Sequence, residues 1–150
     1  MQVSRMRSCL RLAAALEFSA RRRRDDVSFD IFLQDFAETP EDRSSEVLQV
    51  LSPLMQESGQ QITTSDGEAD VYGASDLPLT GLMFTHIAGE AAWDVIFQVA
   101  LAAGWVVMPV GFPVLVPEAR LVDSIPAELS DMGIDVVGSG ADILRIVLNH

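Results

Sequence analysis

The first regular pattern in the chain is an alternation of apolar and polar residues near position 30. Residues 27–36 read VSFDIFLQDF, and Phe29, Ile31 and Leu33 share one face of this segment when it is extended. A period of two residues is typical of a β-strand. The segment is therefore predicted to be the first strand of a sheet.

A helical period follows between residues 39 and 55. Thr39 is suited to the N-cap and Pro40 to the first helical position, and acidic residues come directly after them. Apolar side chains then recur three or four residues apart, at Val47, Leu48, Leu51, Leu54 and Met55. Pro53 is unfavourable inside a helix, and Gly59 is suited to ending one.

Shorter runs predict the remaining elements. Strands are expected at residues 60–64, 69–72, 79–87, 105–109, 113–117 and 134–137. Helical segments are expected at residues 89–103, 124–133 and 141–148, with Gly104 ending the first of them and Ser139 capping the last. This order predicts an α+β fold: a single two-layer sandwich in which a mixed sheet of about five to seven short strands is covered by two or three helices.

Charge divides the chain into two parts. Residues 1–26 contain seven of the ten arginines and three acids, whereas residues 27–150 contain three arginines and nineteen of the 22 acids, a formal charge of −16. We interpret residues 1–26 as an arginine-rich disordered extension, or as upstream sequence translated in error. A signal peptide is disfavoured because Arg11 and Glu17 interrupt its only apolar stretch. Residues 27–150 are predicted to form a single acidic domain.

The negative charge of residues 27–150 argues against some classes of binding partner and favours another. A domain at −16 repels nucleic-acid backbones and anionic lipid headgroups, which argues against binding to either. The same charge attracts a basic protein and accelerates its association. The single cysteine, Cys9, cannot form an intramolecular disulfide, and a cytoplasmic location fits this cysteine usage. The sequence makes no prediction of oligomeric state.

One uncharged stretch raises the question of a membrane span. Residues 95–116 contain no charged side chain and are long enough to cross a bilayer. Gly104, Pro109, Gly111 and Pro113 divide the stretch into shorter elements, which favours a buried core. A membrane-associated protein that uses residues 95–116 is kept as an alternative.

Candidate chemistry is confined to one short cluster. His86, Glu90 and Asp94 recur at four-residue steps, which on one helix face would allow them to bind a divalent metal. Gly89 is expected to start the helix after His86, and this disrupts the alignment. A small enzyme or metal-dependent hydrolase centred on these three residues is a second alternative. The sequence predicts no catalytic residue, resident metal or cofactor.

Three segments carry a resemblance to other proteins. They are SFDIFLQDF at residues 28–36, FTHIAGEAAWD at residues 84–94 and GWVVMPVGFPVLV at residues 104–116. In this layout the chain resembles small uncharacterised bacterial proteins, some of which are thought to act as immunity proteins beside secreted toxins. The resemblance implies a protein-binding role and supplies no catalytic residues.

Charge and resemblance together favour a non-catalytic protein-binding domain, an immunity-type or regulatory partner of a basic protein. The predicted contact surface consists of acidic residues in the first strand, the following loop and the hairpin region. They are Asp30, Asp35, Glu38, Asp66, Glu68, Asp70 and Asp76.

Overall fold

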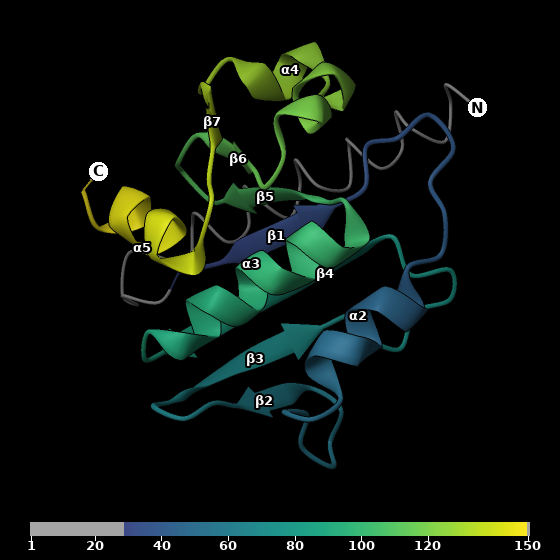
Figure 1. The fold of residues 1–150 in the computed structure, drawn as a ribbon, viewed down its shortest axis with the longest axis vertical. Helices are drawn as coiled ribbons and strands as arrows, with labels where there is room; N and C mark the ends of the chain where they lie inside the picture. Colours follow the sequence, from purple (N-terminus) through teal and green to yellow (C-terminus); the bar gives the residue numbers. More distant parts are fainter. Residues whose placement is uncertain (1–28, 150) are drawn as a thin grey trace.

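The structure is a computed structural model that describes residues 29–149. Within these residues, seven strands form one mixed sheet (Figure 1). The predictions for residues 1–26 lie outside these residues. The spatial order is β2-β3-β4-β1-β5-β6-β7. The strands are β1 (Ile31–Gln34), β2 (Gln61–Thr63), β3 (Glu68–Tyr72), β4 (Gly81–Ala88), β5 (Val106–Pro109), β6 (Val114–Val116) and β7 (Ile134–Val136).

The first strand lies in the middle of the sheet. Ile31 pairs with Phe84 of β4 on one side and with Pro109 of β5 on the other, both antiparallel. Every other neighbouring pair is antiparallel except β6 and β7, which are parallel. The predicted α+β fold with a mixed sheet is confirmed, at the upper end of the expected number of strands.

Helices in the described residues outnumber the two or three that the sequence predicts. They are α2 (Ser44–Leu51), α3 (Ala91–Ala103), α4 (Ala127–Ser130), α5 (Gly140–Leu148) and the 3₁₀ helix η1 (Ala119–Ser124). Helix α4 lies within the helical segment expected at residues 124–133, whereas η1 was not predicted. A 3₁₀ helix of six residues is too short to show a helical period in the sequence.

The main core lies between one face of the sheet and the helices α2, α3 and α5. In Figure 1, α3 crosses the middle of the sheet, with α2 and α5 on either side of it. Its inner face buries Ala92, Trp93, Ile96, Phe97, Val99, Ala100 and Ala103. Complete burial of a large apolar side chain contributes about 1.5–3 kcal/mol relative to exposure, so this face is a major source of stability.

A second apolar cluster occupies the opposite face of the sheet. Phe32 of β1 and Met108 of β5 pack there with Leu121 of η1. The uncharged residues 95–116 are thus divided among α3, β5 and β6 and contribute to both clusters. No helix within residues 29–149 is long and apolar enough to cross a membrane.

The predicted helix over residues 39–55 is wrong at both ends, because α2 covers only Ser44–Leu51. The Asp42 carboxylate accepts the Ser44 N–H at 3.1 Å and the Leu79 N–H at 2.8 Å, which ties the start of α2 to the segment before β4. Residues 39–42 are therefore not helical and belong to the segment that connects β1 with α2. After Pro53 the chain turns, and Met55 forms an isolated bridge with Ile62.

The last helix is capped as predicted and packs closely on α3. The Ser139 hydroxyl accepts the Asp142 N–H at 3.1 Å. A Cβ placed on Gly140 would lie 2.3 Å from the Asp94 nitrogen and 2.4 Å from the Trp93 carbonyl carbon. Helix α5 therefore meets the backbone of α3 at a position that has no room for a side chain.

The substitution Gly140→Ala is expected to destabilise the protein by about 1–3 kcal/mol, because the added methyl group forces α5 away from α3. Urea denaturation measures the change in the free energy of unfolding. Gly138→Ala is the matched control, since a Cβ there would lie 3.6 Å from the Asp142 carboxylate, an ordinary contact. Equal destabilisation by both substitutions would contradict the close packing at Gly140.

Candidate functional site

The seven acids predicted to form one contact surface lie in three places. The strand register puts Glu68 of β3 opposite Ala88 of β4 at one end of the sheet, and Tyr72 opposite Met83 nearer the other. Asp66 and Glu68 belong to the first end, where β4 leads into α3. Asp35, Glu38 and Asp76 follow strand ends at the second, while Asp30 and Asp70 lie between the two ends.

Asp66 has a structural role at the first end. Its carboxylate accepts the Glu90 N–H at 2.8 Å and the Ala91 N–H at 3.2 Å, the first two backbone donors of α3. These two hydrogen bonds lower the pKa of Asp66. The local N-cap, Glu90, makes no side-chain cap of its own. The β2–β3 turn therefore supplies the cap of a helix that begins 25 residues later, and local sequence contains no signal for this contact.

Asp30 and Asp70 take part in a polar row across three strands. Asp70 is the register partner of Thr85, whose hydroxyl donates to the Asp30 carboxylate at 2.6 Å. Asp70 lies 2.9 Å from Nδ1 of His86 and accepts a hydrogen bond from Gln61 at 3.3 Å. Both predicted contact acids are thus engaged with side chains of the same chain.

The structure does not assemble the candidate metal site of His86, Glu90 and Asp94. His86 belongs to β4, where the register with β3 shifts and its φ is 51°, so the four-residue helical step from His86 to Glu90 does not apply. Its imidazole lies beside Asp70, whereas Glu90 and Asp94 line a groove elsewhere. No three His, Cys, Asp or Glu side chains within residues 29–149 are close enough to hold a metal ion.

Glu90 and Asp94 line a groove of about 400 Å³ between α3 and α5, which we call the α3–α5 groove. Both acids are exposed on the α3 side. Leu144 and Leu148 supply an apolar surface from α5, and Leu148 is 64% exposed. The groove combines an acidic wall with an apolar wall. Sequence reasoning missed it because α3 and α5 are far apart along the chain.

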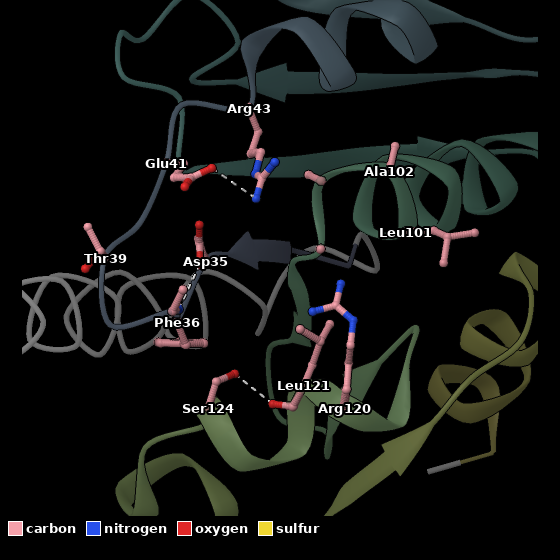
Figure 2. A pocket seen from close by; sticks show the side chains of 13 residues that line it. Asp35, Phe36, Thr39, Glu41, Arg43, Leu101, Ala102, Arg120, Leu121 and Ser124 are labelled. Carbon is pink, nitrogen blue, oxygen red and sulfur yellow. Dashed lines mark hydrogen bonds and ion pairs between the residues drawn. The ribbon is translucent and has the colours of Figure 1, made fainter.

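A second hollow lies at the other end of α3, and we call it the α3 C-terminal pocket (Figure 2). It has a volume of about 340 Å³ and lies between the end of β1, the end of α3 and η1. Asp35 lines it with 8% of its surface exposed, and its carboxylate accepts the Ala37 N–H at 2.8 Å. Asp35 is therefore a pocket residue and is not part of an open acidic surface.

Each of the three arginines in residues 29–149 already contacts a carboxylate of the same chain. The pairs are Arg43 with Glu41 and Glu46, Arg120 with Glu118, and Arg145 with Asp142. The domain carries nineteen acids in all, so most of its negative charge has no cation to offset it. The electrostatic potential around the domain is consequently negative, except close to the arginines.

No protein-family model matches the sequence, and no curated protein or solved structure matches it significantly. The resemblance to small bacterial immunity-like proteins accordingly stays a prediction.

The substitution Asp66→Asn is expected to lower the urea midpoint of unfolding at about pH 7, because it removes a charged acceptor from the start of α3. The pKa of Asp66 in the folded state lies below its ordinary value. The carboxylate therefore stabilises the folded state fully at any pH above that ordinary pKa. This stabilisation is lost as pH falls through the lowered pKa. The difference in urea midpoint between the wild type and Asp66→Asn should therefore be smaller at about pH 3 than at neutral pH.

Glu68→Gln is the control for this experiment, because Glu68 is an exposed acid two residues later, at the start of β3. Its midpoint should stay close to that of the wild type at both pH values. A loss in Glu68→Gln as large as in Asp66→Asn would show that general charge, and not the cap, is responsible.

Proposed function

We propose that residues 29–149 form a non-catalytic domain that binds a basic protein, as an immunity-type or regulatory partner. The observation that carries the proposal is the pairing of all three arginines of this region with carboxylates, in a domain of nineteen acids. A field of this sign attracts a basic partner and raises the association rate constant.

The α3–α5 groove is the best-placed contact site for such a partner. Glu90 and Asp94 offer carboxylates on one wall, and Leu144 and Leu148 offer apolar surface on the other. An exposed apolar side chain beside charged groups is the arrangement in which a segment with both basic and apolar residues is recognised. The occupant that complements this groove is therefore a basic, partly apolar segment of the partner protein.

Arg145 at the edge of the groove does not cancel this complementarity. Its guanidinium contacts Asp142 one turn earlier on the same helix, so the pair adds no net charge. Asp66 and Asp70, in contrast, are poor contact candidates, because the first caps α3 and the second lies beside His86. The contact surface proposed from the structure is thus displaced from the hairpin acids to the first turn of α3.

The immunity role is tested by a growth assay. The product of the adjacent gene is expressed in a host cell, with and without the full 150-residue chain. Toxicity that co-expression relieves is the expected result, and it identifies the partner. An adjacent product that is harmless, or a toxicity that the full chain does not relieve, would contradict the immunity role.

Neutralising Glu90 and Asp94 together, as Glu90→Gln and Asp94→Asn, is expected to lower the association rate constant for that partner about two- to tenfold. The effect should shrink as ionic strength rises from about 0.05 to 0.5 M, because salt screens steering. Stopped-flow or surface plasmon resonance measures the rate constant.

The matched control is Glu38→Gln with Asp76→Asn, which removes the same charge from exposed positions at the other end of the sheet. We expect this control to change the rate constant much less than the groove variant. If both double variants lowered the rate constant equally, the result would still agree with attraction by the charge of the whole domain. It would rule out the α3–α5 groove as the contact site.

A further inference from the structure

Two of the three arginines in residues 29–149 line a single hollow, the α3 C-terminal pocket. Figure 2 shows Arg43 and Arg120 extending their guanidinium groups toward each other from opposite sides of it. Arg43 directly precedes α2, and Arg120 belongs to η1. Two distant segments of a strongly acidic domain thus bring positive charge to one place.

Arg43 keeps donor capacity for a ligand. Its terminal nitrogens lie 3.5 Å from Glu41 and 3.9 Å from Glu46. Charge-assisted hydrogen bonds between such groups are shorter, about 2.7–2.9 Å. Neither contact is therefore a strong hydrogen bond, and an anionic group in the pocket can compete for these nitrogens.

Arg120 keeps donors as well. Its contact with Glu118 uses Nε, which leaves the two terminal nitrogens of the planar guanidinium for a second acceptor. One of these nitrogens lies 3.4 Å from the position that a Cβ on Gly104 would take, beside the residue that ends α3. The side chain is 66% exposed, so it is accessible from solvent.

Carboxylates balance these arginines within the same lining. Asp35 lies inside the pocket, and one of its carboxylate oxygens accepts a hydrogen bond from the Ala37 N–H. Glu41 is at the rim, with 71% of its side chain exposed. A simple anion would be repelled by these two acids, and a simple cation by the two arginines. A ligand that carries both charges complements both pairs.

We propose that the α3 C-terminal pocket binds a small zwitterion of the amino-acid class. Its carboxylate would bind Arg43 and Arg120, and its ammonium group would bind Asp35 and Glu41. Phe36, Leu101 and Leu121 line the same pocket and offer apolar surface to an aliphatic side chain. The volume of about 340 Å³ lies within the range of small-molecule sites. This site is separate from the α3–α5 groove and does not depend on the proposed protein partner.

Isothermal titration calorimetry on the full chain tests the proposal with a panel of the common L-amino acids as probes. At least one is expected to bind with one-to-one stoichiometry. For the tightest binder, two matched probes follow: the acid that lacks the amino group and the amine that lacks the carboxylate. Each half-molecule should bind at least about tenfold more weakly, because it leaves one charged pair without a partner.

Variants identify the pocket as the site. Arg43→Gln and Arg120→Gln are each expected to weaken binding at least about tenfold, because each removes a charged donor. Arg145→Gln is the matched control, since it makes the same charge change at the α3–α5 groove. Unchanged thermal midpoints show that the variants are folded, and Arg120→Gln keeps the test valid if Arg43→Gln is not folded.

Three results would overturn the proposal. One is the absence of heat of binding for every amino acid up to about 10 mM. Another is a half-molecule that binds as tightly as the whole amino acid, which would indicate a simple ion site. The third is equal weakening by Arg145→Gln, which would place the binding outside this pocket. None of these results bears on the growth assay for the protein partner.

Discussion

The burial of α3 against the middle of the sheet is the contact on which the other features depend. Seven of its thirteen residues are buried, and it lies between α2 and α5. Its two ends open onto the α3–α5 groove and the α3 C-terminal pocket. The first turn forms the acidic wall of the α3–α5 groove, and the last turn and Gly104 line the α3 C-terminal pocket. Both candidate sites would be lost if this helix moved.

The carboxylates of this acidic domain fall into two groups with different physical roles. Asp42, Asp66 and Asp142 lie near helix starts or turns and accept backbone N–H groups. The donors are Leu79 and Ser44 for Asp42, Glu90 and Ala91 for Asp66, and Gly138 for Asp142, and these hydrogen bonds lower the pKa of each carboxyl. They stabilise the fold only while ionised, so acid weakens the folded state as pH falls through the lowered pKa values. Exposed acids such as Glu90 and Asp94 make no such bonds and supply the field that a basic partner meets. Net charge alone does not separate the two groups.

Prediction from the sequence was most reliable where a pattern is repeated over several residues. The alternation around Ile31 and the helical period of α3 each extend over enough positions to define an element and its buried face. It failed at helix boundaries, where Asp42 binds the backbone of Leu79 and delays the start of α2. For His86, the expected helix start at Gly89 already argued against an alignment with Glu90 and Asp94. The sequence did not show that a register shift between β3 and β4 places its imidazole beside Asp70.

Local patterns in the chain were sufficient for the α+β class, the order of the elements and the strong acidity, since periodicity and charge are properties of neighbouring residues. The arrangement of side chains from distant segments required the folded structure. Asp66 accepts the backbone N–H of Glu90 at one end of the sheet, and Arg43 and Arg120 line opposite sides of one pocket. Such contacts depend on how strands pair and how helices pack. No short stretch of residues contains that information, because the free energy that selects the packing comes from the whole core.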